Sequence, residues 1–147
     1  MIKVRFYPLE AIDGESLAFA VIASRYHGQW VYCKHRQRDA VEIPGGHREP
    51  GEPILDTARR ELYEETGAAK YTLRQVCAYS VQAGEGPETF GALFLAEIET
   101  LGPLPAYEME RIELYPGLPE RQTYPEIQPH LQAKAAEFLN QAADLPE

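Results

Sequence analysis

Hydrophobic and polar positions divide the chain into strand-like and helix-like segments. The run at 17–25, Leu-Ala-Phe-Ala-Val-Ile-Ala-Ser-Arg, has the apolar character of a buried strand. The turn at 27–29 and the segment 30–35 predict that this strand returns as a hairpin. Further strands are predicted at 2–7, 41–43, 71–82, 89–99 and 110–114, with a loop at 84–87.

Two helices are predicted between and after these strands. The first begins after Gly51 and Pro53, since proline is tolerated in a first turn, and it ends at Gly67, which suits a left-handed cap. The second covers 128–142, where one face carries Leu131, Ala135, Phe138 and Leu139. The order predicts an α/β (α+β) fold with a mixed sheet between helices. Nothing marks a second domain, so residues 1–147 are predicted to form one.

The composition narrows the class of protein. A net charge of −9 argues against non-specific nucleic-acid binding, which requires a basic surface. No apolar run approaches the roughly 20 residues that a membrane-spanning helix needs. The N-terminal residues lack the apolar segment of a signal peptide, so we expect a cytoplasmic protein without membrane attachment. Cys33 and Cys77 lie in strand-like stretches and are expected to be buried thiols.

Three glutamates of the first predicted helix are distinguished by their spacing. Glu61, Glu64 and Glu65 are three and four positions apart, so their carboxylates share one helix face. The apolar stripe through Ile54 and Ala58 continues to Glu61 and Glu65, where core side chains would be expected. Such carboxylates are poorly solvated and need a cation or a proton, although Glu-rich helices often have only solvated faces. Oxygen ligands alone favour magnesium, manganese or calcium over zinc.

The wider spacing separates this helix from ordinary Glu-rich helices. The segment 46–68 resembles the Nudix box, Gly-x5-Glu-x7-Arg-Glu-U-x-Glu-Glu-x-Gly-U, in which U is a bulky aliphatic residue. All seven fixed positions match, namely Gly46, Glu52, Arg60, Glu61, Glu64, Glu65 and Gly67. Leu62 matches the first aliphatic position, whereas Ala68 is smaller than the second requires. The order of predicted elements is also similar to that of MutT-like Nudix domains, which are α/β/α sandwiches.

The resemblance implies a divalent-metal site, with Mg²⁺ expected and Mn²⁺ as the alternative. By position, Glu64 and Glu65 would be metal ligands, and Glu61 would either bind metal or deprotonate water. The carbonyl of Gly45 would be a further ligand, because the family uses the backbone just before the box. These four residues would form the centre of the site.

Other residues would support or complete this site. The supporting residues would be Gly46, Glu52, Arg60 and Gly67. Glu52 and Arg60 would pair to orient the helix, although Arg60 could equally form a surface ion pair with Glu64. The family often adds a carboxylate beyond the box, and the candidates are Glu85, Glu88, Glu108 and Glu110. Glu108 is our choice as a metal ligand, with a solvated loop carboxylate as the alternative.

Residues outside the box are harder to interpret. Four cations bracket the predicted hairpin and would contact phosphates or only protect a strand edge: Arg25, Lys34, Arg36 and Arg38. Four tyrosines would stack on a base or lie in the core: Tyr7, Tyr26, Tyr79 and Tyr124. The histidines, at 27, 35, 47 and 130, are interpreted as loop or surface residues.

The implied reaction is attack of water on a phosphorus of a small nucleoside diphosphate linked to a group X. The favoured substrate is a nucleoside triphosphate, oxidised ones included, giving monophosphate and pyrophosphate. The alternatives are ADP-ribose, a nucleotide sugar or a dinucleoside polyphosphate, and Pro87 lies near the proline of ADP-ribose enzymes. A third possibility is a nucleotide-binding Nudix module without catalysis, although such modules lose box glutamates. The pattern indicates no oligomeric state.

Overall fold

The computed structural model describes residues 1–144, with the backbone alone at 142–144. Its strands are β1 (Ile2–Tyr7), β2 (Leu17–Tyr26), β3 (Gln29–His35), β4 (Val41–Glu42), β5 (Gly45–His47), β6 (Ala68–Ala83), β7 (Glu88–Leu101) and β8 (Met109–Tyr115). Its helices are α1 (Ile54–Thr66) and α2 (Gln128–Asp144), and the 3₁₀ turns η1 (Leu9–Ala11) and η2 (Gly14–Ser16) precede β2. The predicted strands and helices are all present, and β5 is a strand that the pattern did not predict.

The strands form one mixed sheet whose pairing places the start of the box at its centre. The order is β1-β6-β7-β2-β3-β4, with β5 beside β2 and β8 beside β3. β2 runs parallel to β7 and antiparallel to β3 and β5. β5 pairs with β2 at Phe19–Val21, whereas β3 pairs with it at Ser24–Tyr26. The residues that lead into α1 therefore lie against the first half of a central strand.

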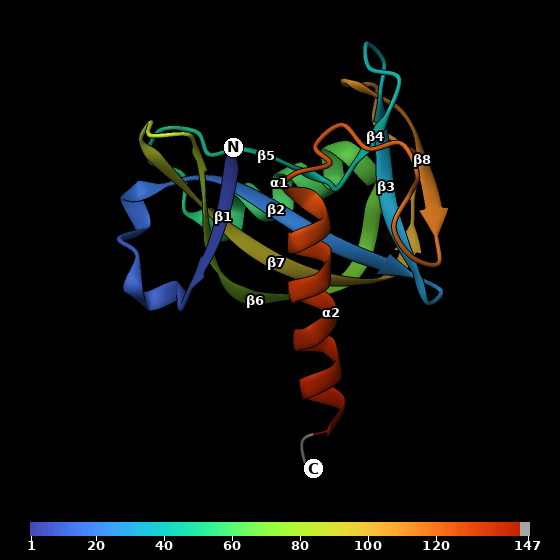
Figure 1. The fold of residues 1–147 in the computed structure, drawn as a ribbon. Coiled ribbons are helices and arrows are strands. Elements are labelled where there is room, and N and C mark those ends of the chain that lie inside the picture. The colour runs from blue at the N-terminus through green and yellow to red at the C-terminus, as the bar shows by residue number, and fades with distance from the viewer. Residues whose placement is uncertain (145–147) are drawn as a thin grey trace.

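The sheet is covered by one helix on each face, as predicted. Ile22 of β2 packs with Leu62 of α1 in one hydrophobic cluster. Its neighbour Val21 packs with Leu131 of α2 in a second cluster on the opposite face. A strand buried on both faces reads as a continuous apolar run, which is why 17–25 lacks alternation. Figure 1 shows α2 in front of the sheet and α1 behind it.

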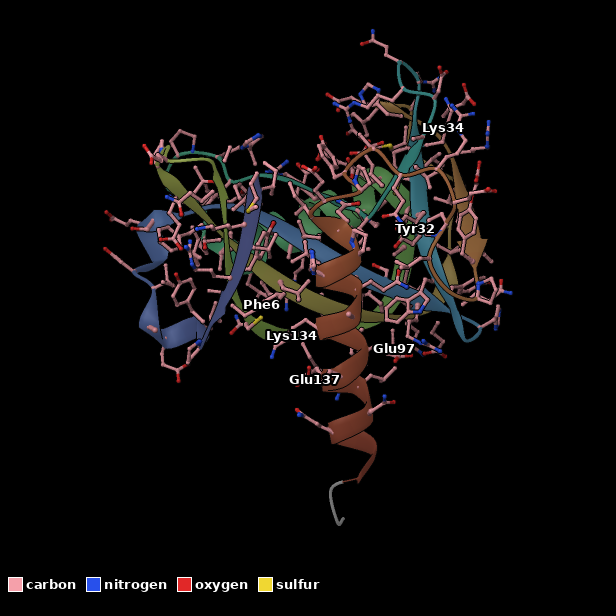
Figure 2. The ribbon with its side chains drawn as sticks, viewed as in Figure 1. Phe6, Tyr32, Lys34, Glu97, Lys134 and Glu137 are labelled. Carbon is pink, nitrogen blue, oxygen red and sulfur yellow. The ribbon has the colours of Figure 1, made fainter. Side chains whose placement is uncertain are left out.

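α2 also contacts β1, at one edge of the sheet, and β3, toward the other edge (Figure 2). Lys134 places its Nζ 5.4 Å from the centre of the Phe6 ring, which is a cation–π distance. Tyr32 in β3 donates its hydroxyl hydrogen bond to Gln132 Oε1. Among the described residues, neither helix has the length and hydrophobicity that crossing a bilayer requires.

The bounds of α1 follow from its two flanking residues. Pro53 is the N-cap, with φ −59° and ψ 141°. Gly67 is the C-cap with φ 76°, and its N–H donates to the Tyr63 carbonyl at 2.9 Å. A β-carbon on Gly67 would lie 2.6 Å from the Pro103 carbonyl oxygen. Position 67 therefore requires glycine both for its backbone conformation and for the close approach of the chain after β7.

We expect Gly67→Ala to lower the free energy of unfolding by about 2–4 kcal/mol, because alanine meets a left-handed backbone and a carbonyl oxygen together. Urea denaturation would measure the change. The matched control is Gly51→Ala, since Gly51 has the same φ of +76° with nothing within 4 Å of its added β-carbon. The control should lose only about 1–2 kcal/mol. Equal losses at both positions would show that the contact with Pro103 has no cost.

Candidate active site

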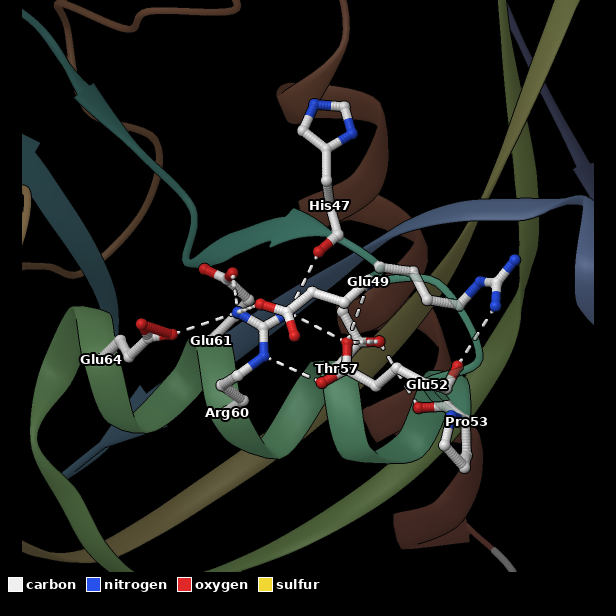
Figure 3. A network of polar contacts seen from close by, with 9 residues as sticks. His47, Glu49, Glu52, Pro53, Thr57, Arg60, Glu61 and Glu64 are labelled. Carbon is white, nitrogen blue, oxygen red and sulfur yellow. Dashed lines mark hydrogen bonds and ion pairs between the residues drawn. The ribbon is translucent and has the colours of Figure 1, made fainter.

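The guanidinium of Arg60 joins helix α1 to the loop before it (Figure 3). Its Nε and Nη2 donate to the two carboxylate oxygens of Glu52, each at 2.9 Å. Glu52 Oε1 also accepts from Thr57 Oγ1 at 2.7 Å and from the Glu49 N–H at 3.1 Å. These donors, Arg60 first, lower the pKa of Glu52 to about 2. Glu52 therefore stays ionised and fixes the position of Arg60.

Arg60 also contacts two of the predicted metal-binding glutamates. Its Nη1 lies 2.7 Å from Glu61 Oε1 and 3.1 Å from Glu64 Oε2, and its Nη2 donates to the His47 carbonyl at 3.1 Å. The contact with Glu64 is thus one part of a network and not an isolated surface pair. A planar guanidinium with five donors can serve all of these acceptors at once.

Glu65 is the most enclosed carboxylate of the helix. Its side chain points into the fold, the residue is 8% exposed, and its Oε1 accepts from the Gly45 N–H at 2.8 Å. Burial raises the pKa of Glu65 to about 9, against the opposing effect of the Gly45 hydrogen bond, and the charges of Glu61, Glu42 and Glu108 raise it further. The protein alone therefore stabilises the ionised form of Glu65 poorly.

Glu61 lies directly against the backbone of β5. A β-carbon on Gly46 would be 2.3 Å from Glu61 Cδ, so glycine is required for the carboxylate to reach this place. Burial raises the pKa of Glu61 to about 7, while Arg60 lowers it and the nearby charge of Glu64 raises it. A carboxylate with this pKa is divided between its two protonation states near neutral pH.

The backbone of β5 turns its free polar groups toward α1. Just before β5, the Pro44 carbonyl accepts from the Ile22 N–H, and just after it, the Arg48 N–H donates to the Ala18 carbonyl, each at 2.8 Å. In an extended strand the N–H and C=O of one residue point to the same side, so Gly45 and His47 point away from β2. The His47 carbonyl indeed accepts from Arg60. The Gly45 carbonyl therefore faces the side on which the helix glutamates lie.

Four carboxylates meet at one cavity of about 210 Å³. Its lining consists of Arg60, Glu61, Glu64, Glu65, Tyr107 and Glu108, and we call it the acidic cavity. Glu108 comes from the segment just before β8, and its charge raises the pKa of both Glu61 and Glu65. The structure thus brings the candidate from outside the box to the box glutamates.

The other acidic candidates outside the box lie elsewhere. Glu88 accepts from the hydroxyls of Tyr7 and Ser80 near the far edge of the sheet. Glu110 contacts Arg111, and Glu85 lies in the exposed turn between β6 and β7. None of the three borders the acidic cavity.

The acidic cavity offers the ligands of a hard divalent cation. Its donors are the oxygens of four carboxylates, and two of these, Glu61 and Glu65, have raised pKa values that a cation would counteract. Gly45, whose carbonyl faces the helix glutamates, is not part of the lining of this cavity. Within residues 1–144, no three His, Cys, Asp or Glu side chains already surround one metal position. Arg60 lies against Glu61 and Glu64 in this arrangement. The donor set fits Mg²⁺ or Mn²⁺.

A larger, mainly apolar cavity of about 410 Å³ adjoins the first, and we call it the apolar cavity. Its apolar walls include Phe19, Val21, Ile43, Tyr79, Met109 and Leu131, and its polar lining includes Arg38, Glu42 and Gln128. Glu65 and Glu108 border both cavities. Gln128 and Glu42 were not identified from the sequence, because no local signal marks a side chain that reaches the cavity only through tertiary packing.

The cations and tyrosines proposed from the sequence separate into two groups. Arg38 borders the apolar cavity and pairs with Glu42 at 2.7 Å, and Tyr79 and Tyr124 also line this cavity. Arg25 instead stacks on the Trp30 ring at 4.9 Å. Tyr7 and Tyr26 line neither cavity and pack against the core beneath α1. His47 is exposed, as expected of a surface residue, and it also lines the apolar cavity.

Comparison with known sequences supports the resemblance to the Nudix box. A profile of the NUDIX domain matches residues 14–116, which is more than half of the chain. YtkD of Bacillus subtilis (strain 168), assigned as an 8-oxo-dGTP diphosphatase, is 34% identical over 100 residues, covering 67% of this chain and 62% of that protein. An ADP-ribose pyrophosphatase of the same organism is 34% identical over 88 residues, covering 57% and 48%. The chain thus spans less than two thirds of the length of these relatives.

Solved structures show the same fold. The pyrophosphohydrolase BsRppH of Bacillus subtilis is 26% identical with a TM-score of 0.74, and the match covers 92% of this chain and 90% of that one. The NUDIX domain of NrtR from Shewanella oneidensis, complexed with ADP ribose, is 15% identical with a TM-score of 0.66, covering 90% and 94%. The profile, the relatives and the fold lead to one conclusion: the chain belongs to the Nudix hydrolase family.

Proposed function

We propose that this chain is a Mg²⁺-dependent hydrolase of a nucleoside diphosphate linked to a group X. The observation that carries the proposal is the meeting of four carboxylates at the acidic cavity, which shares Glu65 and Glu108 with the apolar cavity. The apolar cavity has the size and walls to take a nucleoside, and the acidic cavity would take the phosphates together with metal. Two adjoining cavities of opposite character suit a molecule with an aromatic end and an anionic end.

The metal would be held by Glu64, Glu65, Glu108 and the Gly45 carbonyl, with Glu61 as a further ligand or as the base. When bound, Mg²⁺ or Mn²⁺ neutralises phosphate oxygens and lowers the pKa of the attacking water. Family members generally use divalent metal ions, and the oxygen donors of this chain favour Mg²⁺ as the ion.

Glu61 is suited to receive the proton of the attacking water, because its pKa of about 7 lies near the working pH. Water would form a new bond to phosphorus as the phosphoanhydride bond breaks, and the leaving phosphate would keep the bond's electron pair. Arg60 would keep Glu61 in place through the 2.7 Å contact while its other nitrogens bind Glu52. The main contribution of the protein would be position and charge.

The substrate that we favour is a nucleoside triphosphate, oxidised ones included, cleaved to monophosphate and pyrophosphate. The similarity to YtkD over 67% of this chain supports it. The apolar cavity also offers a directed donor: Gln128 Oε1 accepts from the Ile43 N–H at 2.8 Å, which leaves the amide nitrogen of Gln128 as the group to offer a base. An acceptor on the base edge, such as a purine carbonyl, matches this nitrogen.

ADP-ribose is the second candidate. The similarity to an ADP-ribose pyrophosphatase covers 57% of this chain and supports it. Pro87 lies next to β7 in the turn after β6, and it borders neither of the two cavities. The structure therefore offers no contact by which this proline would favour ADP-ribose.

A product-release assay over a nucleotide panel tests the proposal. The panel contains the four dNTPs, 8-oxo-dGTP, ADP-ribose, a nucleotide sugar and Ap4A, each with Mg²⁺, with Mn²⁺ and with excess EDTA. We expect monophosphate and pyrophosphate from a triphosphate with either metal, and a rate in EDTA at least about 10³-fold lower.

Other outcomes would correct particular parts of the proposal. Undiminished hydrolysis in EDTA would overturn the metal mechanism. Faster cleavage of ADP-ribose than of every triphosphate would assign the enzyme to the second candidate. Tight nucleotide binding without hydrolysis anywhere in the panel would favour a binding module over an enzyme.

A further inference from the structure

His35 ends strand β3 beside the carboxylate of Glu108. Its Nε2 lies 3.6 Å from Glu108 Oε2, and its Nδ1 accepts from the Gln37 N–H at 3.1 Å. The His35 side chain is only 12% exposed, whereas that of Glu108 is 76% exposed. A largely buried ring therefore faces an exposed carboxylate, which would be free to rotate in solvent without such a neighbour.

The hydrogen bond from Gln37 determines which nitrogen of the ring carries the proton. A neutral imidazole has one donor nitrogen and one acceptor nitrogen, and Nδ1 is the acceptor here because it receives a backbone N–H. The proton of neutral His35 is therefore on Nε2, the nitrogen nearest to Glu108. The ring presents a donor to the carboxylate without needing a positive charge.

The backbone near His35 holds the same segment. The Arg36 N–H donates to the Glu108 carbonyl at 3.0 Å, and Arg36 Nε donates to the Tyr107 carbonyl at 3.3 Å. The pairing of β3 with β8 changes register between Lys34 and His35. The end of β3 therefore holds the backbone of Glu108, the residue that reaches the acidic cavity from outside the box, and places a ring nitrogen 3.6 Å from its carboxylate.

We propose that His35 is a positioning residue that orients the Glu108 carboxylate toward the divalent cation of the acidic cavity. The inference rests on the proposed function, because it assumes that Glu108 is a metal ligand. An exposed glutamate loses rotamer freedom when it binds a metal, and a buried N–H donor 3.6 Å from one of its oxygens favours the rotamers that keep this oxygen near the ring, which reduces that loss. Histidine therefore acts through Glu108 and touches neither metal nor substrate.

Two substitutions of His35 distinguish the contact of Nδ1 with Gln37 from the contact of Nε2 with Glu108. Asparagine places its amide oxygen near the position of Nδ1 and nothing near Nε2, so H35N keeps the Gln37 contact and loses the Glu108 contact. Glutamine reaches the position of Nε2 with an amide donor, so H35Q keeps the Glu108 contact. The matched control is H130N, because His130 is exposed and borders neither cavity.

The measurement is the binding of Mn²⁺ to the substrate-free protein, by calorimetry or by the electron paramagnetic resonance of the free ion. We expect H35N to weaken Mn²⁺ binding about tenfold, which is the usual size of an effect on a residue behind a metal ligand. H35Q should recover most of the affinity, and H130N should match the wild type. Thermal unfolding of each metal-free variant shows whether it is folded.

A double-mutant cycle with E108Q decides whether the effect passes through Glu108. H35N should weaken Mn²⁺ binding in the wild type and have no further effect in the E108Q background. Unchanged affinity in H35N, or an equal loss in both backgrounds, would overturn the inference.

The same titration separates this inference from the proposed metal site. If E65Q weakens Mn²⁺ binding and E108Q does not, only the role of Glu108 and His35 is wrong. If neither variant changes the affinity, the metal site itself is wrong and the inference fails with it.

Discussion

Glu65→Gln is expected to lower kcat by about 10³-fold while it stabilises the metal-free protein at alkaline pH. The loss of activity follows from the proposal that Glu65 is a charged metal ligand, whose removal costs several kcal/mol of transition-state stabilisation, and about 4 kcal/mol corresponds to that factor. The gain in stability follows from the 8% exposure of Glu65 and from its raised pKa of about 9. Glutamine is neutral and keeps an oxygen that can accept from the Gly45 N–H.

The pH dependence of this gain has a definite direction. Below about pH 4.5 Glu65 is protonated in both the folded and the unfolded chain, so the substitution changes little. Between pH 4.5 and 9 the unfolded chain releases a proton that the folded chain keeps, so wild-type stability falls as the pH rises. Glu61 adds a similar fall up to its pKa of about 7. The Tm advantage of E65Q in EDTA should therefore increase toward pH 9.

Thermal unfolding in EDTA at pH 5 and at pH 8.5 measures this difference, and each kcal/mol corresponds to about 2–4 °C in Tm. With saturating Mg²⁺ the order should reverse, because the proposed metal site would bind the ion more tightly in the wild type, which would then gain more stability than E65Q. The control is Glu99→Gln, since Glu99 is an exposed residue paired with Lys70 at the surface. An active E65Q, or a Tm difference that does not change with pH, would contradict the assignment of Glu65.

Arg60→Ala is expected to lower the free energy of unfolding by about 3 kcal/mol and to reduce activity as well. The guanidinium holds Glu52 through two hydrogen bonds, contacts two more carboxylates and donates to the His47 carbonyl. Its loss leaves the part-buried Glu52 without its main partner. The pKa of Glu52, now about 2, should rise, so stability that the pair contributes above about pH 4.5 should be lost.

The neighbouring Arg59→Ala is the control, because Arg59 lies on the same helix and is exposed. Urea denaturation should show a change within about 0.5 kcal/mol for this variant. Arg60→Lys should fall between wild type and alanine, since an ammonium group cannot bind both oxygens of Glu52 in the same geometry. A loss in R60A no greater than that in R59A would show that the network contributes nothing to stability.

The elements that could be predicted from the sequence are those with local signals. The hairpin turn has φ 52° at His27 and φ 78° at Gly28, and two left-handed residues in succession suit a tight hairpin. Helix α1 lies between Pro53 and Gly67 as predicted, because both residues act on the backbone next to them. The alternation of Val21 and Ile22 between the two faces follows from strand geometry alone.

Strand β5 could not be predicted in this way. Gly45 and Gly46 have no side chains, so they contribute nothing to a hydrophobic pattern. Their pairing with β2 depends on the distant strand, and the need for glycine at 46 depends on Glu61 of the following helix. Both the pairing with β2 and the contact with Glu61 are tertiary interactions, which a local sequence pattern does not reveal.

The site was predictable where helix geometry determines it. The spacing of Glu61, Glu64 and Glu65 placed them on one face, and the structure places all three at the acidic cavity. The contacts of Arg60 with Glu61 and Glu64 were not foreseen as a network, because they depend on the position to which Glu52 holds the guanidinium.

Among the strands of residues 1–144, β5 pairs with β2 alone, along one of its two edges. Along the other, Glu65 accepts from the Gly45 N–H and Arg60 donates to the His47 carbonyl, so two polar side chains of α1 take the place of a neighbouring strand at these two groups. Exchanging both residues for apolar ones would leave two backbone groups without partners. A member of this family that lacked catalysis but kept β5 would therefore still be under selection to keep polar side chains at both positions. For protein engineering, Glu65→Gln with Arg60 retained is the natural route to an inert scaffold.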